Sequence, residues 1–502
     1  MTTVINAKLG TAKGGVARVW LEGQKLIHAG IRIGAQYVLK GDSTSKRVEL
    51  VAVEQGAELG KGKGIFTVSK RERNGVVSPL LEVRSELLSA FFEGCEKVRV
   101  AIRAGRILIT ARQIDVKIRE RVERLKRKLA ARERLAVGSL FHGIGVLDKA
   151  LHKGLLAAGV AAFVQVGVEL EGEYLDASLR NNPEIWSEGS VAINSDIRDV
   201  YLGGAVPQLD LVCGGVPCTG ASVSGRAKNK LVHAEDHSTA GTLFFDYLEF
   251  VKATNPAVVL LENVVPYANT AGMSVIRSVL TSLGYNLFET TLSGPQFGAI
   301  ENRHRLVMVA VSKGISADEF VFPNTHHSVL SGEVSTLAGV LDDVPLDSPR
   351  WKSYDYLVEK EERDIAAGKG FRRQLVTGES TTVGTIGRGY ARCRSTEAFV
   401  LHPDNPKLSR LLTPAEHARV KGIPETMGHG LSDTTAHEGY GQAVIFNKFE
   451  AVGVAIGSYL RGLPMPSSYY VPKTMVADAS GGSADAEAVV KGEPVQAELL
   501  VA

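Results

Sequence analysis

Residues 135–159 read LAVGSLFHGIGVLDKALHKGLLAAG, and this stretch decides the fold class. The apolar run LAVGSLF passes into a glycine turn, HGIG, and then into a helical pattern that ends at Gly159. A strand that leads through a turn into a helix is the unit of a mostly parallel α/β sheet. Further strands are indicated by AFVQVGVEL, LDLVCGG, AVVLLENV, YNLFETTL and RLVMVAV. From Ala136 onward the sequence therefore predicts a mainly parallel, twisted sheet with helices on both faces.

Composition narrows the class of protein. A chain of 502 residues with 44% hydrophobic and 23% charged residues predicts two or three soluble globular units. Its four cysteines, at 95, 213, 218 and 393, form no CxxC pair and no Cys/His cluster. We therefore expect neither a disulfide framework nor a metal site, and a reducing cytoplasm as the location. With no apolar run of about 18 residues and no signal peptide, no membrane association is expected.

Residues 1–112 follow a different rhythm of short alternating runs, such as ARVWLEG, RVELVAV and KVRVAIR, which predict half-buried strands. An internal echo lies at an offset of 60 residues. Leu21, Glu22, Ile27, Ile31, Gly34 and Val38 match Leu81, Glu82, Leu87, Phe91, Gly94 and Val98. Two such units could interlock as a small β-barrel. The region is similar to the swapped-hairpin DNA-binding fold of transition-state regulators, although a dimerisation or protein-binding role stays open.

A basic segment follows, with ten Lys and Arg against four Asp and Glu between Arg112 and Arg134. Apolar residues recur at helical spacing, at Ile114, Ile118, Val122, Leu125 and Leu129. The pattern predicts an amphipathic helix with a basic outer face. That face is either a solvated connector or a surface that follows phosphates.

The turn HGIG places Gly143 and Gly145 where a ligand can approach the backbone. A dinucleotide fingerprint would need a third glycine where Asp148 stands, which disfavours a pyrophosphate loop. Glu169 ends the second strand, where a carboxylate can bind both hydroxyls of a ribose, and Asp196 follows the third strand. This acid-lined edge suits a nucleoside without phosphates, such as S-adenosylmethionine.

Three further motifs carry reactive groups. GGVPCTGAS, residues 214–222, places Cys218 directly after a proline at the end of an apolar run. Glu262 and Asn263 end another apolar strand, where α/β sheets place ligands, although a helix cap is the alternative. ENRHRL sets Arg303 and Arg305 on the same side of a strand by period two, or on an exposed edge.

The ordered set LFHGIG, GGVPC, LENV, GAIENRHRL, LLTPAEHARVKGIPE and GYGQAVIFN resembles the DNA (cytosine-5)-methyltransferase family over about 136–465. The resemblance implies a Rossmann-like, S-adenosylmethionine-dependent methyltransferase fold, with a small recognition region and an extra N-terminal β-rich domain here. It implies methyl transfer from S-adenosylmethionine to carbon 5 of a flipped-out cytosine in double-stranded DNA, through a covalent cysteine adduct. A tRNA cytosine-5 methyltransferase and a non-catalytic DNA-binding regulator are the alternatives.

The family pattern assigns roles to residues of this chain. Cys218 would attack carbon 6 of cytosine, because a thiol is nucleophilic even when little ionised. Glu262 would bind ring nitrogen 3 and the exocyclic amine, Asn263 would support the loop, and Arg305 with Arg303 would hold the base oxygen and the catalytic loop. The residues expected to line the methyl donor are Phe141, Gly143, Gly145, Glu169, Asp196, Pro217 and Leu243. The stretch after Cys218 would close over the flipped base, and Cys213 would be inert core.

Three positions depart from the family pattern. Thr219 and Glu301 stand where the family usually has Gln, and Gln442 stands where it usually has Asn. Glu301 would bring an extra negative charge close to the site, and Gln442 would alter packing beside the donor. None of these changes removes a reacting group, so activity is expected.

The expected organisation, by residue number, is a β-rich domain at 1–112, a basic linker helix at 113–135, catalytic parts at 136–313 and 410–465, a connecting and target-recognition region at 314–409, and a disordered tail at 466–502. Only about 350–405 is left to read DNA, with Arg388 and Arg392 or Arg394 as contacts or as ordinary surface arginines. A cognate restriction endonuclease and binding to the nucleoid are further implied; the target sequence is not.

Overall fold

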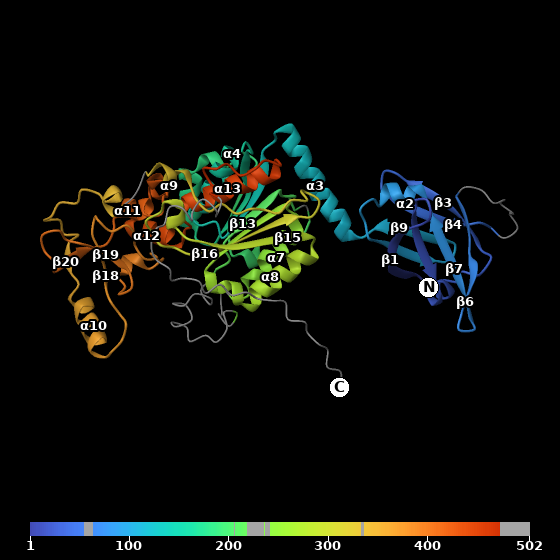
Figure 1. Cartoon of the computed structure of the whole chain (residues 1–502), viewed down its shortest axis with the longest axis horizontal. Coiled ribbons are helices and arrows are strands. Elements are labelled where there is room, and N and C mark those ends of the chain that lie inside the picture. The colour runs from blue at the N-terminus through green and yellow to red at the C-terminus, as the bar shows by residue number, and fades with distance from the viewer. Residues whose placement is uncertain (55–63, 205, 218–234, 236–240, 333–335, 472–502) are drawn as a thin grey trace.

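The computed structural model describes residues 1–54, 64–204, 206–217, 235, 241–332 and 336–471. Figure 1 shows three folded parts in a row: strands from the N-terminus at one end, a central sheet flanked by helices, and a smaller region at the other end. In the described part of the chain no single helix is long and apolar enough to cross a membrane, and two adjacent C-terminal helices reach that length only together, across a 43° bend.

The central sheet confirms the predicted α/β class. Its seven strands lie in the order β12-β11-β10-β13-β14-β16-β15, and β16 alone runs in the direction opposite to the other six. Every residue of β10 is buried, as expected for a parallel strand covered on both faces. The strands are β10 (Leu135–Leu140), β11 (Ala162–Glu169), β12 (Val191–Asn194), β13 (Leu211–Gly214), β14 (Val258–Asn263), β15 (Tyr285–Leu292) and β16 (Arg305–Ser312).

Two layers of helices cover this sheet, with α4 and α13 on one face and α7 and α8 on the other (Figure 1). A Cβ atom at Gly154 of α4 would lie 2.0 Å from the carbonyl oxygen of Glu450 in α13, so glycine lets these helices touch. The C-terminal helix thus packs against the helix that follows the first strand. The helices are α4 (Val146–Ala157), α5 (Gly172–Asn181), α7 (Leu243–Thr254), α8 (Ala271–Ser282) and α13 (Phe446–Leu460).

The smaller region contains a four-stranded sheet in the order β17-β20-β19-β18. Its strands are β17 (Lys352–Ser353), β18 (Gln374–Val376), β19 (Ala398–Leu401) and β20 (Leu408–Arg410). The helices around it are α10 (Asp355–Ala366), α11 (Pro414–Arg419) and α12 (Asp433–Gln442), whereas α9 (His327–Ser331) lies beside α13, where Asn447 Nδ2 donates to Ser328 Oγ.

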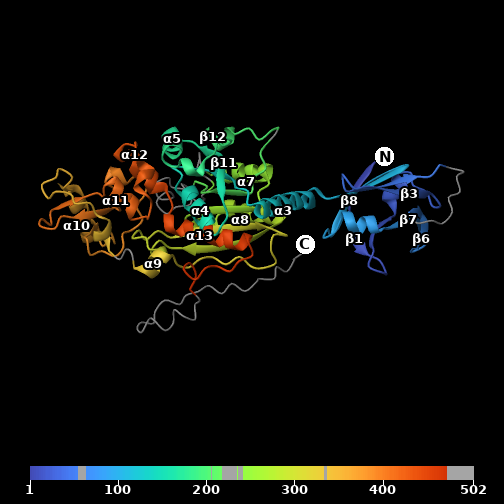
Figure 2. The same cartoon turned by 90° about the horizontal axis from the view of Figure 1, so that it is seen from above.

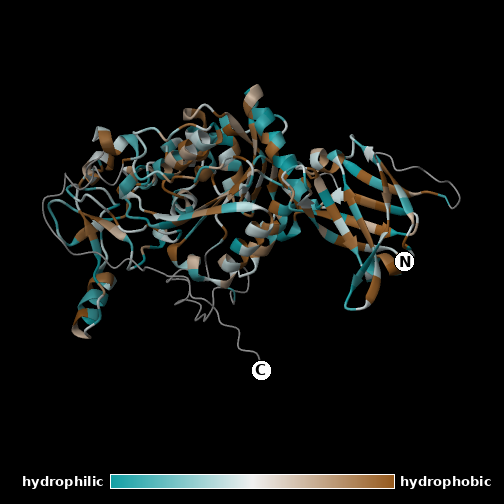
Figure 3. Ribbon diagram, turned by 45° about the vertical axis from the view of Figure 1, so that its right-hand side comes forward, coloured by the Kyte–Doolittle hydropathy of each residue, from teal (hydrophilic) through white to brown (hydrophobic). Residues whose placement is uncertain are grey.

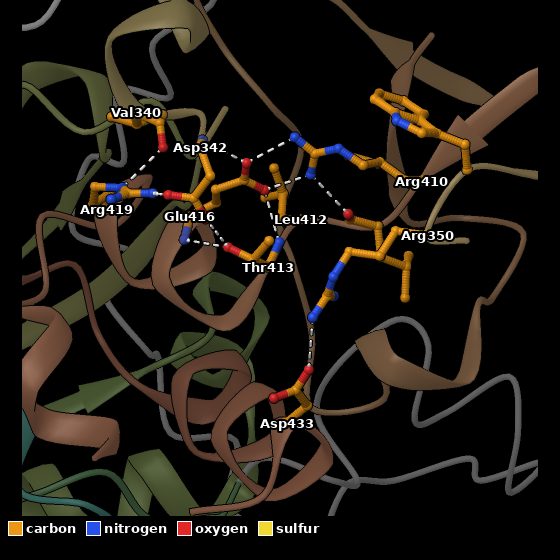
Figure 4. Close-up of polar contacts among 12 residues, drawn as sticks. Val340, Asp342, Arg350, Arg410, Leu412, Thr413, Glu416, Arg419 and Asp433 are labelled. Carbon is orange, nitrogen blue, oxygen red and sulfur yellow. Dashed lines mark hydrogen bonds and ion pairs between the residues drawn. The ribbon is translucent and has the colours of Figure 1, made fainter. Parts of the chain in front are cut away.

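A buried ion-pair cluster joins this sheet to α11 and to the segment at Asp342 (Figure 4). Arg410 at the end of β20 donates two hydrogen bonds, of 2.6 and 2.7 Å, to the two oxygens of Glu416 in α11. Glu416 also forms a capping box with Thr413. The Asp342 backbone donates to Glu416 (2.8 Å), and the Asp342 carboxylate pairs with Arg419. The bidentate pair therefore holds β20 against α11. The contacts of Asp342 hold α11 to the segment that enters the region.

The N-terminal strands close into a barrel. Their order is β5-β3-β4-β9-β8-β1-β2-β7-β6, and β5 and β6 at its two ends are separated in the chain by Val68 alone. Figure 3 shows apolar and polar residues alternating along these strands. The strands are β1 (Thr3–Thr11), β2 (Ala17–Glu22), β3 (Gln36–Asp42), β4 (Arg47–Ala52), β5 (Ile65–Thr67), β6 (Ser69–Arg73), β7 (Val76–Arg84), β8 (Lys97–Arg103) and β9 (Arg106–Ala111), with helices α1 (Gln24–His28) and α2 (Glu86–Phe91).

Strand register shows an internal two-fold relation in the barrel. Leu21 of β2 lies opposite Leu81 of β7, its own counterpart at an offset of 60 residues. Val38 lies opposite Val51 in β3–β4, and Val98 lies opposite Ala111 in β8–β9, again 60 residues on. The two units interlock, because β2 pairs with β7 and β4 pairs with β9.

Helix α3 (Gln113–Ala131) follows β9 and docks on the central sheet (Figure 1). The prediction that its cations form an outer face is wrong for three of them. Arg121, only 2% exposed, donates to Ser312 Oγ (2.6 Å) and to the carbonyls of Leu283 and Gly284. Arg124 and Lys128 form ion pairs of 3.1 and 2.5 Å with Asp210.

Candidate active site

The turn between β10 and α4 has unusual backbone geometry. Phe141 has φ +57°, and Gly143 and Gly145 have φ +59° and +82°. A bulky residue rarely adopts positive φ, and such strain gathers at ligand-binding turns. Gly143 N–H donates a 2.6 Å hydrogen bond to Glu169 Oε2 at the end of β11. Gly143 and Glu169, both predicted to line the methyl donor, are therefore in direct contact.

A buried network that sequence reasoning missed holds this turn in place. His142 Nδ1 lies 3.0 Å from Asp148 Oδ2, and His142 Nε2 lies 2.7 Å from Ser178 Oγ. A Cβ atom at Gly145 would approach Ser178 Oγ to 2.6 Å, so the network closes around glycine. Cys213 has no exposed area and lies in the core, as predicted, and burial raises the pKa of its thiol well above the usual range.

The other predicted donor residues lie at or near the same sheet edge. Asp196 follows β12 and begins a short helical turn, where its carboxylate accepts from Arg198 at 2.6 Å, and that hydrogen bond lowers the pKa of Asp196. Leu243 is buried at the first turn of α7. Pro217 is the last described residue before Cys218, which lies outside the described residues, as do Thr219 and most of the stretch expected to close over the base.

Asn263 ties two of the predicted motifs together. Its Nδ2 donates to the Val216 carbonyl at 3.0 Å, one residue before Pro217. The 2% exposed Asn263 side chain thus anchors the loop after β13 to the end of β14. Sequence reasoning predicted this supporting role.

Glu262 and Arg305 form the charged centre of the site. Arg305 Nε lies 3.0 Å from Glu262 Oε1, and each side chain is 13% exposed. A Cβ atom at Gly215 would lie 3.0 Å from Glu262 Oε2, so a larger residue there would crowd the carboxylate. A carboxylate and a guanidinium side by side can together bind a planar ligand edge that carries both donors and acceptors.

Arg303 differs from its predicted position. Strand β16 begins at Arg305, so Arg303 lies before the strand and the period-two argument does not apply to it. Its Nη1 lies 3.4 Å from Glu301 Oε1 and its Nη2 lies 3.4 Å from the carbonyl oxygen of Gln442. The 5% exposed side chain therefore pairs with Glu301, not with Glu262.

Two buried lysines support this segment, and sequence reasoning predicted neither of them. Lys421 Nζ lies 2.5 Å from Glu301 Oε2, and both side chains have no exposed area. Lys448 Nζ in α13 donates to the carbonyls of Leu292 and Arg303, each at 3.0 Å. Burial lowers the pKa of Lys421 and of Lys448 to about 7, although Glu301 opposes the shift in Lys421. The extra negative charge of Glu301 is thus compensated by a buried cation.

Ion pairs join the recognition region to the side of the sheet where the methyl donor is predicted to bind. Arg388 Nη2 lies 3.1 Å from Glu171 Oε1, and both Arg388 and Arg392 lie within 3.5 Å of Glu438. These two arginines, predicted as DNA contacts, are here paired with carboxylates. Gln442 Nε2 donates to Tyr174 OH (3.3 Å), which is how it packs beside the predicted donor pocket.

In the described ranges, His326, His327 and Glu450 are the set whose ligand atoms lie close enough to consider a metal ion, within 4.8 Å of one another. However, Lys153 Nζ lies 2.9 Å from Glu450 Oε2. An ammonium group at this distance already supplies the positive charge that a metal would bring, so the cluster fits an ion pair better.

Comparison with known proteins places this site in a family. A model of the C-5 cytosine-specific DNA methylase family matches residues 135–458. The chain is 28% identical to the Type II methyltransferase M.SsoII of Shigella sonnei over 264 residues, which is 51% of this chain and slightly under two thirds (65%) of that relative. It is 27% identical to the Type II methyltransferase M.HhaI of Haemophilus parahaemolyticus, over 52% of this chain and 79% of that relative.

Solved structures support the fold. The S. pombe Dnmt2 methyltransferase aligns with 66% of this chain and 99% of its own, with a TM-score of 0.50 and 19% identity. The Entamoeba histolytica methyltransferase EhMeth aligns with 66% of this chain and 98% of its own, with a TM-score of 0.50 and 15% identity. At these identities the likeness shows a shared architecture.

Proposed function

The chain belongs to the C-5 cytosine-specific DNA methylase family, and from that premise we propose that it transfers a methyl group from S-adenosylmethionine to carbon 5 of a flipped-out cytosine in DNA. The observation that carries the proposal is the 3.0 Å contact between Arg305 Nε and Glu262 Oε1. This pair lies at the sheet edge where Asn263 anchors the loop that leads to Cys218.

Glu262 and Arg305 would recognise the base. The Glu262 carboxyl would bind ring nitrogen 3 and the exocyclic amine, and the Arg305 guanidinium would bind the carbonyl oxygen of the base. With side chains 13% exposed, both groups would meet the base with little competition from water. Carbon 5 cannot be reached inside a stacked duplex, so the target cytosine must rotate out of the helix.

Cys218 would supply covalent catalysis. Its thiolate would add to carbon 6, and carbon 5 would then take the methyl group from the sulfonium centre, releasing a neutral thioether. Loss of the carbon 5 proton and cleavage of the carbon–sulfur bond would restore the aromatic ring and the thiolate. Bond formation at carbon 6 is what makes carbon 5 nucleophilic enough to accept the methyl group.

The described residues fit S-adenosylmethionine as the methyl donor. Glu169 would bind the ribose hydroxyls and Asp196 the far end of the adenosyl group, and a Cβ atom at Gly143 would meet nothing within 4 Å, which leaves space for a ligand. The residues proposed to line the donor remain Phe141, Gly143, Gly145, Glu169, Asp196, Pro217 and Leu243. Two carboxylates with no phosphate-binding glycine turn suit this cationic nucleoside.

The test is bisulfite sequencing of host DNA with and without the expressed gene, together with mass spectrometry of nucleosides from purified DNA and tRNA. We expect 5-methylcytosine in DNA at one sequence context, no product from Cys218→Ser, and full product from Cys95→Ser, a matched cysteine control in the N-terminal barrel. Methylation confined to tRNA would contradict the proposal. A cognate endonuclease, as implied for a Type II system, would cut the unmethylated form of the mapped site.

A further inference from the structure

Positive charge is concentrated in the N-terminal barrel. Residues 1–112 contain 19 Lys and Arg against 10 Asp and Glu, a net charge of +9, whereas the whole chain carries +3. The rest of the chain is therefore net negative. A domain that holds this excess in a nearly neutral protein is the part of the chain whose net charge most favours binding to a polyanion.

The excess has a definite position on the barrel. Along β8, Val98, Val100 and Ile102 point into the core with no exposed area, and the alternate residues Lys97, Arg99 and Arg103 are exposed. On β1, Lys8 is exposed beside them. We call Lys8, Lys97, Arg99 and Arg103 the basic face of the barrel.

Within the barrel itself this face is uncompensated. Lys8 lies directly opposite Lys97, and like charges opposite one another destabilise a sheet. Among the residues that the structure describes, no carboxylate pairs with any of the four cations of the basic face. Elsewhere on the barrel Arg18 and Arg84 share Glu82, and Arg71 pairs with Glu22. An external anion would remove the repulsion that the fold leaves in place.

The shape suits an extended polyanion. From Lys97 to Arg103 the strand rises about 20 Å, which matches the rise of about six base pairs of duplex DNA.

Figure 2 shows β1 and β8 on the side of the barrel nearest α3 and the central sheet. Helix α3 docks at the opposite sheet edge from Glu262, because Arg124 binds the Asn255 carbonyl that precedes β14. The length of β14 alone separates the edge that contacts α3 from the edge that carries Glu262 by about 20 Å.

We propose that the basic face binds the phosphates of double-stranded DNA outside the target site, as a second DNA contact of the methyltransferase. The inference rests on the proposed function in that DNA is the polyanion this chain would already hold. Phosphate contacts position a protein and carry no sequence information, so the face adds affinity without changing the methylated sequence.

The experiment compares the full-length triple variant Lys8→Ala, Lys97→Ala, Arg99→Ala with wild type. A matched control, Lys40→Ala, Lys46→Ala, Arg73→Ala, removes the same residue types from the hairpins on the other side of the barrel. Binding is measured from 50 to 200 mM salt on two duplexes carrying a mapped target cytosine, of about 12 and about 40 base pairs. Each lost phosphate contact lowers the slope of log affinity against log salt by about 0.9, so three lower it by about 2.7.

On the long duplex we expect the variant's affinity deficit to be about 40-fold larger at 50 mM than at 200 mM salt, as that slope requires. The short duplex and the control should behave as wild type, and the methylated sequence should not change. Equal slopes for variant and wild type on the long duplex would overturn the proposal, as would a loss of binding only to tRNA or to anionic vesicles. If wild type still methylates DNA in that case, the proposed function stands while this inference fails.

Discussion

The buried pair between Glu301 and Lys421 allows a double-mutant cycle with a large expected coupling. The two charges are 2.5 Å apart, neither side chain is exposed, and Arg303 contributes a longer contact of 3.4 Å. Removing one partner of such a pair leaves an uncompensated buried charge and costs about 3–5 kcal/mol. Replacing both with uncharged residues of similar volume is often nearly neutral.

We therefore expect Glu301→Gln and Lys421→Met each to lower the free energy of unfolding by about 3 kcal/mol. This value is at the lower end of the range because Arg303 partly compensates an unpaired Glu301 and because an unpaired Lys421 can lose its proton. The double variant should lie within about 1 kcal/mol of wild type, which corresponds to a coupling energy of at least about 5 kcal/mol. Urea unfolding followed by fluorescence in a Trp20→Phe background reports on the central and recognition parts through Trp186 and Trp351.

The lowered pKa of Lys421 also predicts how the free energy of unfolding depends on pH. Because its folded pKa of about 7 is below its unfolded value, the folded state binds fewer protons between about pH 7 and 10.5, and this lysine makes stability rise with pH in that window. Lys421→Met should remove that part of the rise. Single-variant costs that add in the double variant would refute the account of a compensated pair.

Three further outcomes are expected. Asp196→Ala should weaken S-adenosylmethionine binding by about 1–3 kcal/mol in calorimetry, and unchanged affinity would show that this carboxylate does not line the donor. Arg121→Ala should destabilise the protein by about 3 kcal/mol in thermal unfolding, because it orphans buried acceptors, whereas the exposed Arg127→Ala should stay within about 0.5 kcal/mol. Burial raises the pKa of Glu397 to about 7, so the contribution of this carboxyl to stability should fall as pH rises from about 4.5 to 7; Glu397→Gln should gain about 1–3 kcal/mol at pH 8 and lose that gain near pH 5, and a gain independent of pH would contradict this.

The parts of the site that could be predicted are those set by strand ends. Glu169, Glu262 and Asn263 close apolar strands, and the carboxyl ends of parallel strands meet at one edge, so chain position alone brings them together. The glycine turn after β10 was readable for the same reason, since it joins a strand to a helix.

The contacts that could not be predicted depend on long-range packing. Lys421 and Lys448 come from segments more than 100 residues away from Glu301 and Arg303, and nothing local marks a lysine as buried. The amphipathic pattern of α3 assigns every cation to solvent, yet Arg121 donates a hydrogen bond to Ser312 at the end of β16. Arg303 was misplaced because period two applies only inside a strand, and β16 begins two residues later.

The central claim is covalent methyl transfer to cytosine by Cys218, and trapping on fluorinated DNA tests it most directly. A duplex with 5-fluorocytosine at the mapped target, incubated with S-adenosylmethionine, should form a stable adduct, because fluorine cannot leave carbon 5 as the proton does and the carbon–sulfur bond then stays intact. The account predicts a denaturation-resistant protein–DNA species whose cross-linked peptide contains Cys218, formed by wild type and Cys95→Ser and absent in Cys218→Ser. A cross-link at another residue, or an undiminished adduct with Cys218→Ser, would contradict it.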